Sequence, residues 1–185
     1  GPEGKRVQII ALDTRYFRRA TLLGEKQWQW FEQQLHKPAE VRIIMSSIQV
    51  VTRDNSWENW MNFPLERTRL FDLLKKTQAE GVVVVSGDRH FGELTVMNAG
   101  IGYPLYDLTT GSFNKAAKKF PTEKNPYRIE KHVETSESFG LITLDWGFIN
   151  PPQITLEIKD GDGNASIERK FPLTLLKRGV LPVFP

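Results

Sequence analysis

Residues 82–90 read Val82-Val83-Val84-Val85-Ser86-Gly87-Asp88-Arg89-His90, an apolar run followed at once by polar and charged side chains. Four consecutive β-branched residues predict a buried strand. The carboxylate of Asp88 and the imidazole of His90 then lie two residues apart at its end. Oxygen and nitrogen donors of these kinds suit Fe, Zn and Mn, and oxygen alone suits Ca or Mg. The stretch therefore predicts either part of a metal site or a hydrogen-bonded structural pair.

The residues before this stretch alternate between strand-like and helix-like patterns. We predict a strand buried on both faces over 7–12, a helix over 24–36, a strand over 41–45 and a helix over about 64–80 that ends at Gly81. Strand–helix–strand order favours a parallel sheet with right-handed crossovers. Such sheets bind ligands beyond the carboxyl ends of their strands, so polar residues at three strand ends should meet at one rim.

After residue 93 the pattern changes to short β-like runs separated by turn residues. These runs cover 94–97, 141–144, 153–158 and 166–171, and Asp160-Gly161 suits a hairpin turn between the last two. The sequence therefore predicts an α/β protein with a parallel or mixed sheet first and antiparallel strands after about residue 93.

The composition is that of an ordinary globular protein. The 185 residues fit one domain, 1–185, and the net charge of +3 does not indicate a nucleic-acid specialist. Cysteine is absent, which excludes thiol nucleophiles and thiolate metal sites. No apolar run is long enough for a membrane span.

Two polar residues follow the first two strands. Arg15 could hold a phosphate bidentately or pair with Asp13, and the Gln49 amide could contact a ligand or the loop backbone. The aromatic segment 57–64 either walls a pocket against water or packs the second helix onto the sheet.

A serine hydrolase is a second enzyme class to weigh, because Ser46, Ser47 and Ser86 are at strand ends and His90 is an available base. However, no Gly-x-Ser-x-Gly elbow is present, and the two-residue spacing of Asp88 and His90 is awkward for a catalytic triad. No glycine-rich phosphate loop occurs either. The sequence therefore gives little support to a serine hydrolase or to a glycine-loop phosphate site.

Taken in order, several blocks of the chain resemble the alkaline phosphatase D (PhoD-like) phosphatases. The blocks are Leu12-Asp13-Thr14-Arg15-Tyr16-Phe17-Arg18, Leu23-Gly24-Glu25 with Gln27-Trp28, Ser46-Ser47-Ile48-Gln49, Trp57-Glu58-Asn59-Trp60, Phe63-Pro64-Leu65-Glu66-Arg67, Ser86-Gly87-Asp88-Arg89-His90-Phe91-Gly92-Glu93 and Tyr103-Pro104-Leu105-Tyr106-Asp107-Leu108-Thr109. Together they are specific, and the resemblance extends over nearly the whole chain.

The resemblance implies a metallophosphoesterase-like β-sandwich flanked by helices, which hydrolyses phosphate monoesters or diesters with metal-activated water or hydroxide. On this analogy Asp88 and His90 match the family's Gly-Asp-x-His metal ligands, and Gln49 lies where relatives place an amide or imidazole. Arg15 or Arg89 would steady the phosphate. The implied metals are Fe and Ca, with Zn, Mn or Mg as alternatives.

The resemblance further implies that the chain is the C-terminal half of a larger catalytic domain. A missing N-terminal half or another chain would then complete the metal site, because two protein ligands hold a divalent ion poorly. An extracytoplasmic location is implied in the same way.

Two other functions stay open beside the phosphatase. One is a non-catalytic remnant of the same fold that binds phosphate or another anion. The other is a nucleic-acid module that uses the basic segment 115–128, although such segments usually form a solvated surface.

Overall fold

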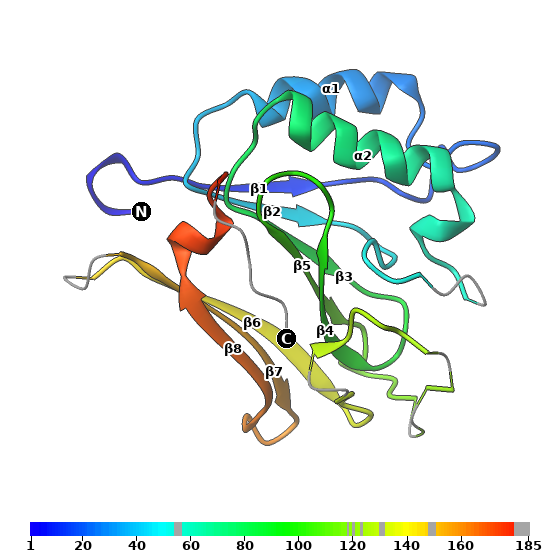
Figure 1. Cartoon of the computed structure of the whole chain (residues 1–185). Coiled ribbons are helices and arrows are strands. Elements are labelled where there is room, and N and C mark those ends of the chain that lie inside the picture. Colours follow the sequence, from blue (N-terminus) through cyan, green and yellow to red (C-terminus); the bar gives the residue numbers. More distant parts are fainter. Residues whose placement is uncertain are drawn as a thin grey trace.

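The structure is a computed structural model that describes residues 1–53, 57–117, 119, 121–122, 124–129, 132–147 and 151–179. Figure 1 shows three layers: two α-helices, a five-stranded sheet below them, and a three-stranded sheet below that. The predicted α/β sandwich of two sheets with flanking helices is confirmed, and both described α-helices lie on the same face of the larger sheet. None of the helices in the described ranges is both long and apolar enough to cross a membrane.

The larger sheet has the strand order β1-β2-β3-β5-β4. Its strands are β1 (Val7–Ala11), β2 (Val41–Met45), β3 (Val82–Ser86), β4 (Gly92–Asn98) and β5 (Pro104–Thr110). The first three pair in parallel, and β5 pairs parallel with β3 and antiparallel with β4. Because β1, β2 and β3 follow one another in one direction, right-handed crossovers put their two helices on the same face.

Helix α1 (Glu25–Leu35) connects β1 to β2, and helix α2 (Pro64–Lys76) lies between β2 and β3. α1 buries its apolar residues Trp28, Phe31 and Leu35, as their spacing predicts. The helices are joined by ion pairs of Arg69 with Glu25 and of Lys76 with Glu32, at N–O distances of 2.7 and 2.6 Å.

Helix α2 ends earlier than predicted, at Lys76, and Gly81 is not its cap. The chain turns at Gln78, whose φ is +55°, and Gly81 instead begins the approach to β3. A Cβ at Gly81 would lie 2.0 Å from the Glu40 carbonyl oxygen, and φ there is +68°. Glycine is therefore required by close backbone contact at the start of the strand.

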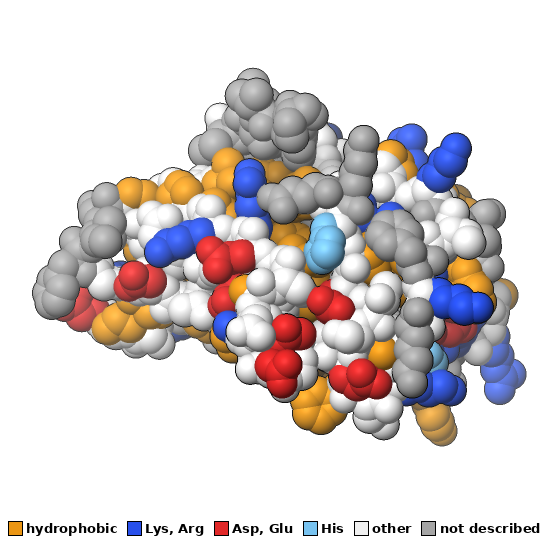
Figure 2. Space-filling view, turned by 90° about the horizontal axis from the view of Figure 1, so that it is seen from below, with side chains coloured by type: hydrophobic (Ala, Val, Ile, Leu, Met, Phe, Trp, Pro, Cys, Tyr) orange, Lys and Arg blue, Asp and Glu red, His pale blue; other side chains and the backbone are white. Residues whose placement is uncertain are grey.

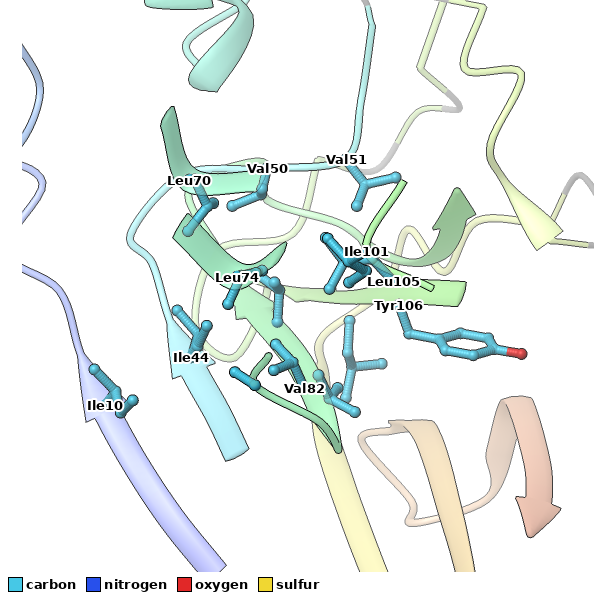
Figure 3. Close-up of a cluster of buried hydrophobic side chains, with 14 of the residues drawn as sticks. Ile10, Ile44, Val50, Val51, Leu70, Leu74, Val82, Ile101, Leu105 and Tyr106 are labelled. Carbon is cyan, nitrogen blue, oxygen red and sulfur yellow. The ribbon is translucent and has the colours of Figure 1, made fainter. Parts of the chain in front are cut away.

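The main core lies between the helices and the larger sheet. Figure 3 shows Ile44 of β2 and Val82 of β3 beneath Leu70 and Leu74 of α2, and all four side chains are buried. The valine run of β3 is thus central to the core, as predicted.

Strand β1, at the edge of the sheet, is not buried on both faces as predicted. Ile10 is 2% exposed, whereas Ile9 on the opposite face is 65% exposed. On that face the strand register brings Ala11 beside Met45, which is 44% exposed. The apolar pattern over 7–12 alone could not show that one face lacks a covering layer.

The smaller sheet is antiparallel, with strands β6 (Ser138–Asp145), β7 (Gln153–Asp160) and β8 (Ala165–Pro172) in that order. It packs on the larger sheet through Phe171, whose ring stacks on Tyr106 of β5 at a centroid distance of 4.6 Å. The predicted hairpin turn at Asp160 joins β7 to β8, and positive φ occurs at Gly163. Antiparallel pairing after residue 93 is confirmed for β4 and for β6 to β8. It does not hold for the β3–β5 pair, and β5 itself was not predicted as a strand.

Candidate functional site at the strand ends

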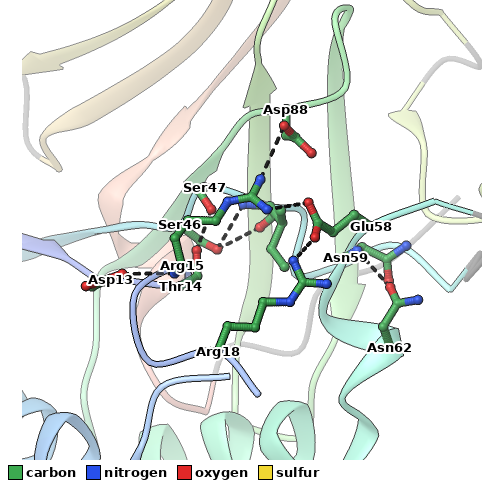
Figure 4. Close-up of polar contacts among 11 residues, drawn as sticks. Asp13, Thr14, Arg15, Arg18, Ser46, Ser47, Glu58, Asn59, Asn62 and Asp88 are labelled. Carbon is green, nitrogen blue, oxygen red and sulfur yellow. Dashed lines mark hydrogen bonds and ion pairs between the residues drawn. The ribbon is translucent and has the colours of Figure 1, made fainter. Parts of the chain in front are cut away.

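Polar residues that follow β1, β2 and β3 meet at one edge of the larger sheet, the edge that parallel strands share at their carboxyl ends. Figure 4 shows side chains from these three segments converging there, with Arg15 reaching across to Asp88. The predicted rim is confirmed as a spatial cluster.

The loop after β3 has an unusual backbone. Asp88 and His90 both have positive φ angles, of 70° and 58°, in the left-handed region that residues other than glycine rarely adopt. The loop also lies close to the end of β5, because a Cβ on Gly111 would be 3.0 Å from the Asp88 amide nitrogen. Such strain persists only where surrounding contacts fix the loop, and it is concentrated at functional sites.

Arg15 pairs with two carboxylates, and neither belongs to Asp13. Its guanidinium lies 2.5 Å from Glu58 and 3.3 Å from Asp88, and Arg18 also forms an ion pair with Glu58. The Asp13 carboxylate instead accepts hydrogen bonds from the backbone N–H groups of Tyr16 and Arg15, which lower the pKa of Asp13. Of the two interpretations of Arg15, pairing with Asp13 is therefore absent from the structure.

Gln49 is buried beneath the rim, with 2% of its surface exposed. Its Nε2 donates hydrogen bonds to Glu93 at 2.5 Å and to Thr109 at 2.9 Å, and its Oε1 accepts one from Arg89 at 3.3 Å. The side chain thus connects Arg89 to groups inside the sheet. A buried position below Arg89 suits an orienting role.

Two buried acids below the rim were missed by the sequence analysis. Glu93 pairs with Arg128 at 2.6 Å and accepts a hydrogen bond from Asn125, so part of the segment 115–128 is anchored and not simply solvated. Asp107 of β5 accepts the amides of Val50 and Val51, and burial raises the pKa of its carboxyl group. For Asp107, the sequence did offer a signal, because an acidic residue stands inside the otherwise largely apolar run 103–109.

The aromatic segment divides between the two predicted roles. Trp60 is fully buried and meets Trp28 edge to face, at a centroid distance of 6.3 Å, so it packs the loop onto the helices. Trp57 is 60% exposed and lines a cavity beside Asp88.

The strand-end serines are not placed as nucleophiles. Ser86 is 3% exposed and donates to Asp107 at 2.6 Å, while Ser46 donates to the carbonyl of Ile48 at 2.7 Å. Ser47 bonds with the hydroxyl of Thr14. These contacts argue against the serine-hydrolase alternative.

Asp88 and His90 have the donor types of a metal site, but the described residues do not complete one. Across those ranges, no group of three or more His, Asp or Glu side chains is placed to hold an ion. A stable site generally needs at least three protein donors. Arg15 also lies on the Asp88 carboxylate, where a cation would otherwise be attracted.

Comparison with known proteins agrees with the fold. A family model described as PhoD-like phosphatase matches residues 3–115, more than half of the chain. A search of the curated proteins gave no match.

Two solved structures have a similar fold. The first, titled "Structure of PhoD", has a TM-score of 0.69 and 17% identity, and the alignment covers 93% of this chain and 41% of that one. The second, titled "GAP50 the anchor in the inner membrane complex of Plasmodium", has a TM-score of 0.67 and 19% identity, covering 95% and 51%. This chain thus spans about half or less of either structure. Because the family model matches more than half of the chain, including all five strands of the larger sheet, the chain belongs to the PhoD-like phosphatase family.

Proposed function

We propose that this chain carries part of the active site of a phosphatase that hydrolyses phosphate monoesters or diesters. The observation that carries the proposal is the loop after β3, which holds Asp88 and His90 in a strained backbone at the rim beside Arg15. Family membership supports the same activity.

In this proposal, Arg15 and Arg89 bind the phosphate oxygens. A guanidinium is always charged and presents paired N–H donors that match phosphate geometry. Gln49 accepts a hydrogen bond from Arg89, so the cation is oriented before substrate arrives. Charge that grows on the phosphate oxygens in the transition state would meet donors already in place.

Asp88 and His90 are the residues that we assign to metal binding, with Fe and Ca, or Zn, Mn or Mg, as the candidate ions. Because they do not form a complete site, the remaining ligands would come from polypeptide outside the described residues. The proposal treats residues 1–185 as one unit of a larger, extracytoplasmic catalytic domain.

The uncovered face of β1 and β2 is the surface on which we place that polypeptide. Val7 and Ile9 are 37% and 65% exposed there, and Met45 extends the apolar face to the rim. In the described ranges, β1 has no strand on its outer edge, and an open edge is a template for pairing with another chain. The two similar solved structures each have about half or more of their chain outside the alignment.

Hydrogen exchange tests this surface. Compared with the isolated 185-residue chain, amides of residues 7–11 should be protected in the protein purified at its natural length. In that protein, Ile9→Lys should restore their exchange, whereas Lys26→Ala on the exposed surface of α1 should not. Equal exchange in both forms would overturn the placement.

The second candidate function is a non-catalytic phosphate-binding remnant. It is favoured by the small number of candidate ligands among the described residues. A nucleic-acid module has less support: Figure 2 shows acidic side chains over the middle of the face seen from below, so this face is not a basic surface suited to a polyanion.

Kinetic measurements separate the two phosphate-binding candidates. We expect the natural-length protein to hydrolyse a phosphate monoester or diester, and both His90→Ala and Asp88→Asn to lose most of kcat/KM. His36→Ala, an exposed position at the end of α1, is the matched control and should leave kcat/KM unchanged. Phosphate binding without turnover would favour the remnant, and a kcat/KM for His90→Ala within a few-fold of the parent would exclude His90 as a ligand.

A further inference from the structure

A cavity of about 380 Å³ opens beside the Asp88–His90 loop. Its walls come from three segments and include Trp57, Glu58, Arg89, Phe91 and Lys119. A volume of roughly 300–1,000 Å³ is typical of small-molecule sites, so this space is larger than a phosphate group requires. The cavity volume that a phosphate would not fill lies next to the residues to which we assign phosphate binding.

The side chain of Arg89 organises one wall of this cavity. Its guanidinium lies 5.5 Å from the centroid of the Trp57 ring and 4.9 Å from that of Phe91. Phe91 is buried, whereas Trp57 is 60% exposed. Cation–π contact and the hydrogen bond to Gln49 thus hold Arg89 and one aromatic wall in place, while most of the Trp57 surface faces solvent.

The charges around the cavity suit an anion. Glu58 is matched by two arginines, Arg15 and Arg18, and Arg15 also pairs with Asp88. The acids of the lining are thus largely compensated, and Lys119 adds a positive charge to the lining.

We propose that this cavity takes the organic group of an anionic phosphate ester, and that Trp57 stacks on a planar aromatic group there. The inference rests on the proposed function, because it names the substrate class of the same site. Stacking of a base on an aromatic side chain is strong enough to select aromatic over aliphatic esters. The planar group could belong to an aryl phosphate or to a nucleotide.

Binding to the protein purified at its natural length, with metal removed by a chelator, tests the proposal without requiring turnover. Isothermal titration calorimetry would compare methyl phosphate, phenyl phosphate and uridine monophosphate at one pH and salt concentration. We expect either aromatic ester to bind about tenfold tighter than methyl phosphate, as stacking on one aromatic side chain allows. Phenyl phosphate alone gaining affinity would point to aryl esters, and uridine monophosphate alone to nucleotides.

Variants at two tryptophans complete the test. Trp57→Ala should remove the preference, so that the aromatic esters bind no tighter than methyl phosphate. Trp57→Phe should retain most of the preference, and Trp30→Ala, at a position 40% exposed on α1, should have no effect. Equal affinities for all three esters, no binding of any, or a preference that survives Trp57→Ala would overturn the inference. Hydrolysis that depends on Asp88 and His90 but not on Trp57 would support the proposed function and contradict the inference. Trp57-dependent binding of aromatic esters without hydrolysis would support the inference and contradict the proposed function.

Discussion

The guanidinium of Arg15, from the segment after β1, lies 3.3 Å from the carboxylate of Asp88, from the loop after β3. The two residues are far apart in sequence and meet because β1 and β3 are parallel strands with only β2 between them. Both side chains are partly exposed, 46% and 40%, so solvent screens the pair and it adds little to folding stability. The pair matters locally, because the Arg15 guanidinium lies against Asp88, a candidate metal ligand.

Replacing Arg15 should therefore affect phosphate binding more than stability. We expect Arg15→Gln to change the free energy of unfolding by less than about 1 kcal/mol and to weaken binding of inorganic phosphate, measured by calorimetry. Arg69→Gln is the matched control, because Arg69 forms a similarly exposed ion pair with Glu25 away from the rim. Equal phosphate affinity in the two variants would remove Arg15 from the site.

Gln49 should matter for stability, because it is a buried partner of other buried polar groups. Gln49→Leu leaves Glu93 and Thr109 each without one hydrogen bond, and we expect a loss of about 1–3 kcal/mol in urea denaturation. Gln49→Glu should cost more, since it places a second carboxylate beside Glu93. Gln33→Leu on the exposed surface of α1 should change stability by less than about 0.5 kcal/mol; a similar value for Gln49→Leu would contradict the buried network.

Two glycines with similar backbone angles should respond differently to alanine. Gly81 and Gly163 have φ of +68° and +86°, but only at Gly81 would a Cβ meet backbone, 2.0 Å from the Glu40 carbonyl oxygen. Gly163→Ala should cost about 1 kcal/mol through φ alone. Gly81→Ala should lower the unfolding free energy further, because the β2–β3 approach must open. Equal losses would show that the close contact is unimportant.

Asp107 should give stability a pH dependence of a defined sign. Burial raises its pKa above the ordinary value of 3.8, so its favourable contribution is complete below that value and is lost as pH rises through the raised pKa. Asp107→Asn removes the charge and keeps an acceptor for the Val50 and Val51 amides. We expect the variant to gain stability relative to the parent as pH rises above 4, measured by urea denaturation at a series of pH values.

Asp160 supplies the opposite case. Backbone N–H groups of the β7–β8 turn, chiefly that of Asn164, lower its pKa, so its contribution is present above pH 3.8 and is lost as pH falls through the lowered pKa. Asp160→Asn should therefore lose stability relative to the parent as pH rises. Parallel pH trends for the two variants would contradict the assignment.

The sequence by itself determined the local elements and the type of sheet. Apolar spacing gave α1, Pro64 marked the start of α2, and the valine run with its polar end located β3 and the candidate ligands Asp88 and His90. Residues close together in the sequence determine these features, because helix period, β-branching and turn chemistry act over short distances along the chain.

Tertiary structure alone decided which of these residues meet. The pairing of Arg15 with Asp88, the burial of Gln49 against Glu93 and the insertion of β5 beside β3 all depend on strand order, which periodicity does not encode. The open face of β1 has the same origin: Ile9 reads as a core residue because it is apolar, yet it is exposed because the smaller sheet does not extend over the edge strand. Burial is a property of what covers a side chain, and the covering layer comes from distant parts of a chain.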